Sequence, residues 1–501
     1  MKIGKVWLVG AGPGDVGLLT VKGKRLLEEA EVVVYDALVG QGILSMLPKG
    51  IAMIDVGKRA GKHKKSQEEI NRILVEEAKK GLRVVRLKGG DPFLFGRGGE
   101  EVEALKCANI PFEIVPGVTS SIAVPAYNGI PVTHRDYTSS VHIITGHKKQ
   151  GESLDIDFAS LVKLKGTLVF LMGLSSLFDI CEGLLEAGMD REMPAAILQE
   201  GCSAGQRSVF TSLSKLVQRA KEENIGMPSI IVVGEVCSLA GEFSWYEKLP
   251  LAGKKIILTR PQNMISTMAE KLRKKGAEVI EFSAISLVEI QENKEFDEAL
   301  SELEKFSWIG FTSPSGVDIF FSKLRKAGLD LRKLAGIKIA VIGQGTKTKL
   351  EERGIYADFM PSVYDGYHMG KELATLVNKE DKILFARAKK GNRELIEEIK
   401  KSGAKVVDIA IYDTLYEKAK VAYREEDFLN KKIYCVAFTS ASTVEGFVKA
   451  MPETFDFSTV RAACIGRQTA EAAKKYGMKV RISKEASIDS LIRLIEEMEE
   501  V

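Results

Sequence analysis

Short apolar runs alternate with amphipathic stretches along the whole chain. Helical spacing of apolar residues predicts helices near Val16–Glu29 and over Gln67–Lys79. Strands that alternate with helices are typical of an α/β fold, so we expect α/β architecture throughout. The apolar runs have the length of buried strands, and those of the first half are Val6–Val9, Val32–Tyr35, Leu82–Leu87, Phe112–Val115, Val141–Thr145, Thr167–Met172, Ala195–Leu198 and Ile230–Val233.

A domain boundary is indicated by Trp245–Lys255, WYEKLPLAGKK, which contains Pro250, small residues and a charge cluster. A new strand follows at Ile256–Leu258, and within the first half the pattern changes after His134–Asp136. These signals predict a first domain over 1–245 with lobes of about 1–135 and 136–245, a linker over 246–253, and a second domain over 254–501.

The second half contains an internal duplication. Phe311–Val317 reads FTSPSGV and Phe438–Val444 reads FTSASTV, each before a predicted helix. Further along, Ile342–Thr346 (IGQGT) corresponds to Ile465–Thr469 (IGRQT) at a strand-to-helix turn. The repeat predicts two similar α/β lobes.

Composition excludes several classes of protein. With 72 Lys and Arg against 68 Asp and Glu, the net charge of +4 is too even for a dedicated nucleic-acid binder. The six cysteines are scattered and the five histidines lack metal-ligand spacing, so we expect reduced thiols and no metal. No signal-peptide pattern opens the sequence and no apolar run approaches the ~20 residues of a membrane span. We therefore expect a cytoplasmic protein without membrane or nucleic-acid partners.

A glycine loop follows the first predicted strand. Gly12–Gly17 matches G-x-G-x-x-G, and Asp36 lies about twenty residues beyond the loop at the end of the next strand, as in dinucleotide-binding folds. A plain tight turn before a helix gives the same pattern. A NAD-dependent dehydrogenase and a tight turn both remain open on this motif alone.

Two further loops make the prediction of a ligand site stronger. Gly89 and Gly90 remove side chains at the end of a buried strand, Asp91 offers an acceptor suited to a hydroxyl pair or an ammonium, and Pro92 stiffens the turn. Pro116–Ser121 adds hydroxyls and backbone amides at a helix start. Several loops at the carboxyl ends of strands in one lobe predict a ligand crevice.

The first half resembles the uroporphyrinogen-III C-methyltransferase family and, more broadly, the tetrapyrrole methylases. The matching segments span nearly all of residues 1–245. They are VGAGPGDVGLLT (9–20), VVVYDALV (32–39), GKRAGKH (57–63), RLKGGDPFLFGRGGEE (86–101), VPGVTSS (115–121), GIPVTHRD (129–136), TGH (145–147), FLMG (170–173) and PSIIVVGEV (228–236).

The resemblance implies a two-lobed fold in which S-adenosyl-L-methionine lies between the lobes and leaves as S-adenosyl-L-homocysteine. It implies proton transfer by Asp36 and Lys58; a helix-cap or ribose-binding role for Asp36 and a solvated loop charge for Lys58 are the alternatives. Many relatives place threonine where Cys202 stands, which we expect to alter packing near the adenine. The implied cofactor contacts are Pro13, Gly89, Gly90, Asp91, Leu94, Thr119, Ser120, Met172 and Gly201.

A basic run follows Lys58. It is either a solvated surface or an electrostatic clamp on the eight carboxylates of the implied substrate. On the second interpretation Arg59 and His63 bind substrate. The other cations of the run are Lys62, Lys64 and Lys65.

The second half, from about 253 to 501, resembles uroporphyrinogen-III synthase. The resemblance implies two α/β lobes joined by a two-stranded linker, one of about 254–287 plus 414–501 and the other of about 290–411. The segments that carry it are IILTRP (256–261), FTSPSGV (311–317), AVIGQGTKTKL (340–350), FARAKKGNREL (385–395), IAIYDT (409–414), FTSASTVEGF (438–447) and IGRQTAEAAKKYG (465–477).

The implied reaction closes linear hydroxymethylbilane into a ring and inverts its last pyrrole. Tyr412 is the family position proposed to help the hydroxyl depart; its alternative is a buried strand tyrosine. Helix capping and solvated surface are the alternatives for the implied substrate contacts. These contacts are Arg260, Thr312, Ser313, Arg387, Thr439 and Ser440.

Together the two resemblances imply a bifunctional enzyme of tetrapyrrole synthesis. We expect the second half to make uroporphyrinogen III and the first half to methylate it at C2 and C7 to precorrin-2, which serves cobalamin and sirohaem synthesis. We also expect a homodimer formed through the methyltransferase domain. A degenerate synthase domain, a non-catalytic nucleotide-binding module and a related corrin methylase with another target carbon remain alternatives.

Overall fold

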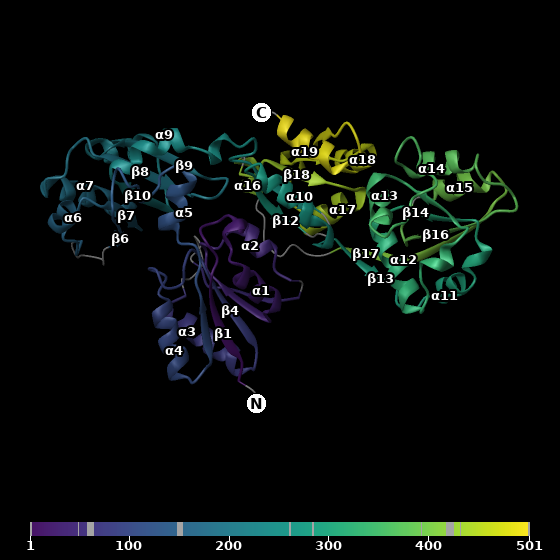
Figure 1. Cartoon of the computed structure of the whole chain (residues 1–501), viewed down its shortest axis with the longest axis horizontal. Coiled ribbons are helices and arrows are strands. Elements are labelled where there is room, and N and C mark those ends of the chain that lie inside the picture. The colour runs from purple at the N-terminus through teal and green to yellow at the C-terminus, as the bar shows by residue number, and fades with distance from the viewer. Residues whose placement is uncertain are drawn as a thin grey trace. The chain divides into compact units, whose positions relative to one another are not determined.

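The computed structural model describes residues 3–48, 50–57, 65–147, 154–259, 262–282, 285–391, 393–416, 425–430 and 432–498. Its contacts divide the chain, which Figure 1 draws as a whole, into two compact units. One comprises 1–256, 269–281 and 430–434, and the other 257–268, 282–429 and 435–501. The described strands form four five-stranded sheets among helices, which confirms the predicted α/β fold class.

The first sheet is parallel and has the order β3-β2-β4-β1-β5. Its strands are β1 (Lys5–Gly10), β2 (Val32–Tyr35), β3 (Ala52–Asp55), β4 (Arg83–Lys88) and β5 (Phe112–Val115). Helices α3 and α4 pack side by side (Figure 1). The helical elements of this lobe are η1 (Val16–Leu18), α1 (Val21–Glu29), α2 (Gln41–Ser45), α3 (Gln67–Lys79), α4 (Gly98–Cys107) and α5 (Ser120–Tyr127).

This strand order differs from that of a dinucleotide-binding fold. There the first strand lies between the second and the fourth, whereas here β4 lies between β2 and β1. The predicted helix near Val16–Glu29 also needs correction. Asp15 caps only the short η1, and α1 begins at Val21 with Thr20 Oγ1 accepting from the Gly23 amide at 3.1 Å. The glycine loop therefore does not open the α-helix directly.

The second sheet is mixed, with the order β6-β7-β10-β8-β9. Residues of β10 alternate between two apolar clusters: Val232 packs on one face and Ile231 on the other. Its strands are β6 (Val141–Thr145), β7 (Thr167–Leu171), β8 (Pro194–Gln199), β9 (Arg207–Ser212) and β10 (Ser229–Val233). Its helical elements are α6 (Phe158–Leu164), η2 (Leu174–Ser176), α7 (Leu177–Glu186), η3 (Leu213–Lys215), α8 (Leu216–Glu222), η4 (Glu235–Leu239), α9 (Ala240–Phe243) and η5 (Tyr246–Lys248).

The third sheet has the order β12-β11-β18-β19-β20, so two early strands adjoin three late ones. Its strands are β11 (Lys255–Thr259), β12 (Glu278–Glu281), β18 (Cys435–Phe438), β19 (Arg461–Cys464) and β20 (Lys479–Ile482). The accompanying helical elements are α10 (Gln262–Lys274), α16 (Glu425–Leu429), α17 (Ala441–Ala450), η8 (Phe457–Thr459), α18 (Arg467–Lys474) and α19 (Ile488–Glu497).

The fourth sheet, in the order β13-β17-β16-β14-β15, is built from the segment between β12 and β18. Strands β13 and β17 pair antiparallel and carry the chain into and out of this sheet. Its strands are β13 (Ile285–Glu289), β14 (Trp308–Phe311), β15 (Lys338–Val341), β16 (Lys382–Ala388) and β17 (Lys405–Tyr416). Its helical elements are α11 (Lys294–Ser301), η6 (Leu303–Lys305), α12 (Pro314–Lys326), η7 (Leu331–Leu334), α13 (Gln344–Glu351), α14 (Gly366–Leu373) and α15 (Glu394–Lys400).

The repeated sequence segments have the same local structure. Ser313 follows β14 and caps α12, and Ser440 follows β18 and caps α17. In each case the serine hydroxyl accepts from a backbone amide of the first helical turn, Gly316 at 3.0 Å and Thr443 at 3.3 Å. No helix in the described part of the chain is long and apolar enough to cross a membrane.

Candidate active sites

Three loops meet at the carboxyl ends of β1, β4 and β5. Gly12 and Gly90 exchange backbone hydrogen bonds of 3.1 and 2.8 Å, which joins the first loop to the second. Gly10 and Gly117 approach so closely that a Cβ on Gly10 would lie 2.4 Å from the Gly117 Cα. The loops that the sequence singled out therefore form one structural unit, and their glycines permit the contact.

Asp91 holds this unit together. Its Oδ1 accepts from the amides of Phe93 at 2.8 Å and Leu94 at 3.0 Å, and its Oδ2 accepts from the Gly117 amide at 3.0 Å. We predicted an acceptor for a ligand hydroxyl or ammonium, but in the structure this carboxylate binds backbone amides of the second and third loops. Asp91 thus shapes the loops.

The predicted cofactor residues of the first lobe surround the junction. Gly90 has a φ of +66°, and a Cβ there would meet only the Ser120 amide nitrogen, 4.0 Å away, among the surrounding atoms. Thr119 caps α5, with Oγ1 accepting from the Ser121 amide at 3.3 Å. Pro13 is half-buried in the first loop. The space beside Gly90 is therefore open to a ligand, while Thr119 has a structural partner.

In the second lobe, Met172 and Gly201 have opposite environments. Met172 is 49% exposed and adopts a left-handed φ of +57°, which is unusual outside glycine and marks a strained site. Gly201 is buried, and a Cβ there would lie 2.3 Å from Val124 Cγ1. Cys202 beside it is buried with a φ of +62°, and its amide donates to Gln206 Oε1 at 3.1 Å. Gly201 is thus required by packing, and Met172 is free to contact a ligand.

Asp36 links the first sheet's β2 to the second loop. Its Oδ1 accepts from the Leu38 amide at 3.1 Å and from the Gly89 amide at 3.5 Å. Its Oδ2 lies 3.5 Å from Arg86 Nη2, and a quarter of the side chain is exposed. The other predicted proton-transfer residue, Lys58, and the predicted substrate residues Arg59, His63 and Arg260 lie outside the described residues.

A second aspartate, in the first loop, was not predicted as a site residue. Asp15 Oδ1 accepts from the Gly17 amide at 2.7 Å, and Oδ2 accepts from the Tyr127 hydroxyl at 2.7 Å. Burial raises the pKa of Tyr127, with the Asp15 bond acting in the same direction. Tyr127 also contacts the rings of Trp245 and Tyr246. The first loop is therefore tied to the end of α5 and to the predicted linker segment.

Arg97, at the end of the second loop, forms an ion pair that was not predicted. It precedes α4 with a left-handed φ of +57°, and its Nε and Nη2 each donate to a separate oxygen of Glu100 at 2.7 Å. The hydrogen bond from Arg97 lowers the pKa of Glu100. The sequence signal was present as opposite charges three residues apart within GRGGEE (96–101).

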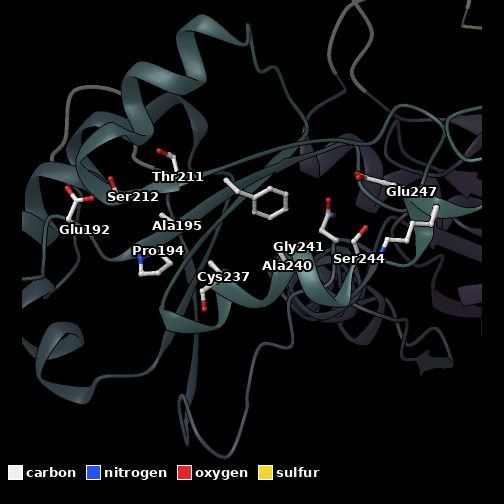
Figure 2. A pocket seen from close by; sticks show the side chains of 14 residues that line it. Glu192, Pro194, Ala195, Thr211, Ser212, Cys237, Ala240, Gly241, Ser244 and Glu247 are labelled. Carbon is white, nitrogen blue, oxygen red and sulfur yellow. The ribbon is translucent and has the colours of Figure 1, made fainter.

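A pocket lies apart from these loops, along β9 and the η4–α9 segment (Figure 2). Pro194, Thr211 and Ser212 line one part of it, and Gly241 and Ser244 another (Figure 2). None of the predicted cofactor residues, all of which the structure describes, lines this pocket. Within the described ranges no group of three or more His, Cys, Asp or Glu residues is arranged to hold a metal ion.

In the second half, Tyr412 is buried on β17 and its hydroxyl lies 2.8 Å from Ser313 Oγ. The pairing of β16 with β17 shifts register between Arg387 and Ala388, so Ile411 is an extra residue directly before Tyr412. Such a bulge redirects the side chains beside it. Burial raises the pKa of Tyr412, and the Ser313 bond opposes that change. The structure therefore joins two predicted residues, one catalytic and one substrate-binding.

Arg387 and Lys389, at the end of β16, differ in their surroundings. Arg387 is buried, with Nε and Nη2 donating to the two Asp408 oxygens at 2.6 and 2.7 Å. Lys389 is exposed, 3.7 Å from Asp413 Oδ2. Arg387, which we predicted to contact substrate, therefore already forms a bidentate ion pair with Asp408 of the neighbouring strand.

The hydroxyl residues at the helix starts act as caps. Ser440 and Thr443 form a reciprocal capping box with bonds of 3.3 Å in both directions, and Ser440 Oγ lies 3.0 Å from Ser442 Oγ. Thr312 and Thr439 are half-buried at the equivalent positions one residue before the caps. Capping is therefore the role that the structure assigns to Ser313 and Ser440, and it leaves the helix N-termini available for carboxylates.

Comparison with known proteins relates the two halves of the chain to two different families. Residues 5–217 match the family model for tetrapyrrole (corrin/porphyrin) methylases, and residues 266–493 match that for uroporphyrinogen-III synthase HemD. The chain is 45% identical over 492 residues to the porphyrin biosynthesis protein HemD of Ruminiclostridium josui, which covers 98% of this chain and 97% of that protein.

Two further relatives match parts of the chain. The uroporphyrinogen-III C-methyltransferase of Bacillus subtilis is 41% identical over 355 residues, which cover 71% of this chain and 72% of that protein. The uroporphyrin-III C-methyl transferase of Thermus thermophilus, crystallised with S-adenyl homocysteine, is 38% identical with a TM-score of 0.41. That match covers 47% of this chain and 99% of that one.

Proposed function

Because the chain belongs to the tetrapyrrole methylases in its first half and to the uroporphyrinogen-III synthases in its second, we propose that it carries out two successive steps of tetrapyrrole synthesis. The second half closes hydroxymethylbilane into uroporphyrinogen III with inversion of ring D. The first half then methylates that product at C2 and C7 to give precorrin-2. The NAD-dependent dehydrogenase suggested by Gly12–Gly17 is wrong, since this family and the strand order of the first sheet both differ from it.

The observation that carries the methylase half of this proposal is the junction of Gly12, Gly90 and Gly117. Glycine at these positions brings three loops together at the carboxyl edge of a parallel sheet, where α/β proteins bind ligands. The open space beside Gly90 fits a ligand that approaches the backbone closely. An apolar, half-exposed Met172 suits an uncharged ring or a thioether.

S-adenosyl-L-methionine supplies an electrophilic methyl group when it is bound. Gly90, Leu94, Ser120 and Met172 would hold it beside the loops, and Asp91 and Thr119 would fix the backbone that it touches. Orientation of the pyrrole carbon toward that methyl group provides most of the rate enhancement. Proton loss from the macrocycle then needs an acceptor, and we assign that role to Asp36, a partly exposed carboxylate at this edge.

In the synthase half, Tyr412 would assist the loss of the hydroxyl from hydroxymethylbilane. The Tyr412 phenol can hand its proton to the leaving oxygen while Ser313 Oγ stabilises the position of the ring. The capped starts of α12 and α17 present free amides to the carboxylate side chains of the substrate. We further propose that the protein is cytoplasmic and forms a homodimer through its methylase domain.

Incubation of the full chain with hydroxymethylbilane and methyl-labelled S-adenosyl-L-methionine tests both steps. A dimethylated product labelled at C2 and C7 is expected. If labelled product forms from uroporphyrinogen III but not from hydroxymethylbilane, the synthase step is contradicted. A degenerate second half would give this result. Label at another carbon, or bound S-adenosyl-L-methionine without transfer, would contradict the methylase step.

A further inference from the structure

A buried ionic cluster stands at the end of β4, directly before the second glycine loop. Arg86 and Lys88 are alternate residues of β4, so their side chains lie on the same face of the sheet. Glu101 belongs to the first turn of α4. The exposed fractions are 2% for Arg86, 4% for Lys88 and 0% for Glu101. Three side chains that normally carry charge are therefore removed from solvent together.

Glu101 holds both cations through one oxygen. Its Oε1 accepts from Arg86 Nε at 3.0 Å and from Lys88 Nζ at 2.9 Å, with Gln67 Nε2 at 3.5 Å. Its Oε2 is buried and has no hydrogen-bond partner among the described residues. Removal of the Glu101 charge would thus release both cations at once.

Arg86 extends the cluster to Asp36. Its Nη2 lies 3.5 Å from Asp36 Oδ2, and its Nη1 donates to the Leu87 carbonyl at 3.0 Å and to the Val34 carbonyl at 3.4 Å. With its remaining nitrogen on Glu101, the guanidinium plane is fixed from three sides. The side chain of Asp36 is 25% exposed, against 3% for Arg86. Asp36 is thus the end of the cluster that reaches solvent.

Stability alone gives no reason to keep such a cluster. Burial of ions costs solvation, and replacement of a buried ion group by well-packed apolar residues is often neutral or stabilising. Desolvation lowers the pKa of Lys88 here, with the positive charge of Arg86 acting in the same direction. What the cluster does provide is a rigid support for Asp36, a partly exposed carboxylate beside the second loop.

We propose that Glu101 is a positioning residue for methyl transfer, which acts through Arg86 to fix the Asp36 carboxylate beside Gly89. This inference rests on the proposed function, in which Asp36 accepts the proton from the macrocycle. Lys88 completes a group of two cations and two carboxylates.

The test replaces Glu101 by glutamine, which keeps the shape and removes the charge. The Glu101→Gln variant should lose kcat for methylation of uroporphyrinogen III by at least about 10-fold, while KM for S-adenosyl-L-methionine stays within about 2-fold, because a misplaced proton acceptor affects the transition state alone. Glu103→Gln, an exposed change in the same helix, is the matched control and should keep the wild-type kcat. Cyclisation of hydroxymethylbilane by the same polypeptide reports folding of the rest of the chain.

A double-mutant cycle separates positioning from general stability. In an Asp36→Asn background, Glu101→Gln should cause less than about 2-fold further loss, because residues that act as a unit are not additive. An equal loss in both backgrounds would overturn the role. If Glu101→Gln lowers the folded fraction, Arg86→Lys is the second test. It keeps the positive charge but removes the guanidinium group that reaches both Glu101 and Asp36, so the same loss of kcat is expected.

Two outcomes distinguish the positioning role of Glu101 from the proposed methylase function. A wild-type chain that methylates uroporphyrinogen III, with Glu101→Gln at full kcat, would overturn the positioning role alone. A wild-type chain that fails to methylate uroporphyrinogen III would overturn the proposed function and this role with it.

Discussion

The hydroxyl of Tyr412 lies 2.8 Å from Oγ of Ser313, the residue that caps helix α12. Ser313 Oγ accepts from the Gly316 amide at the same time. One serine therefore ends a strand, starts a helix and holds a buried phenol. The equivalent residue of the other repeat, Ser440, also caps its helix, but its hydroxyl lies 3.0 Å from Ser442 Oγ, a residue of the same helix.

Ser313→Ala should destabilise the second half more than Ser440→Ala. Both changes remove an N-cap, at about 1 kcal/mol each. Only Ser313→Ala also leaves the buried Tyr412 hydroxyl without this partner, which adds about 1–3 kcal/mol. Calorimetric unfolding of the full-length variants measures the difference in transition temperature, and equal shifts would contradict the prediction.

Tyr412→Phe should lower kcat for cyclisation by about 100-fold, the contribution typical of a positioned acid. Methylation of added uroporphyrinogen III should be unchanged. Tyr356→Phe serves as the control, because Tyr356 is 78% exposed. The rate of uroporphyrinogen III formation from hydroxymethylbilane provides the measurement; a variant with wild-type kcat would make Tyr412 a strand tyrosine only.

Asp91→Ala should abolish methylation and leave cyclisation intact. Its three backbone hydrogen bonds, from Phe93, Leu94 and Gly117, would be lost together, and the loops would no longer be fixed. We expect kcat/KM for methyl transfer to fall by at least about 100-fold, since each of the three bonds contributes on the order of 1 kcal/mol. Loss of both activities would argue against independent domains.

Gly90→Ala and Gly201→Ala should fail for different reasons. At Gly90 a Cβ enters open space at a φ of +66°, so the cost in stability is about 1 kcal/mol and the main effect is a raised Kd for S-adenosyl-L-methionine. At Gly201 the Cβ would collide with Val124 Cγ1 at 2.3 Å, so the protein should unfold at lower temperature. Calorimetric titration with the cofactor and thermal unfolding distinguish the two outcomes.

Alkylation with iodoacetamide at pH 8 should label one cysteine in the native chain. Burial raises the pKa of the thiols of Cys181, Cys237, Cys435 and Cys464 to about 12, so they stay protonated and unreactive until the pH approaches that value. Burial raises the pKa of the Cys202 thiol as well. Exposed Cys107 should therefore react alone.

Mass spectrometry counts the labels. Cys107→Ser should remove labelling of the native protein, and urea should expose the other five cysteines. More than one label on the native wild-type chain would contradict the burial of these thiols.

The apolar pattern located strands well wherever a continuous apolar run marks them, at the edge of a sheet as well as inside it. Val32–Tyr35, Phe112–Val115 and Val141–Thr145 were predicted with the bounds that the structure has. Strand β9 (Arg207–Ser212) was missed because it is an edge strand whose residues are mostly polar or exposed, so no apolar run marks it. The helix near Val16 was misjudged because capping by Asp15 produces a single short turn.

The candidate sites were predictable where glycines signal a close approach, as in the junction of Gly12 with Gly90. The buried cluster was not, because arginine and lysine in a strand ordinarily point to solvent. Only the fold brings Glu101 against Arg86 and Lys88, fifteen and thirteen residues away in sequence. The sequence likewise gives no sign that Asp91 would bind backbone amides of two loops.

The order β12-β11-β18-β19-β20 has a consequence for synthesis on the ribosome. Strands β11 and β12 leave the ribosome early. Strand β18, which lies next to β11 in the finished sheet, begins only at Cys435. The sheet from β13 to β17 is continuous in the chain and can fold in the interval, as can the whole first half. Strand β11 must therefore wait, unpaired on the side that β18 later covers, until translation has passed Phe438. Truncated or stalled chains should be sensitive to aggregation through the free edge of β11.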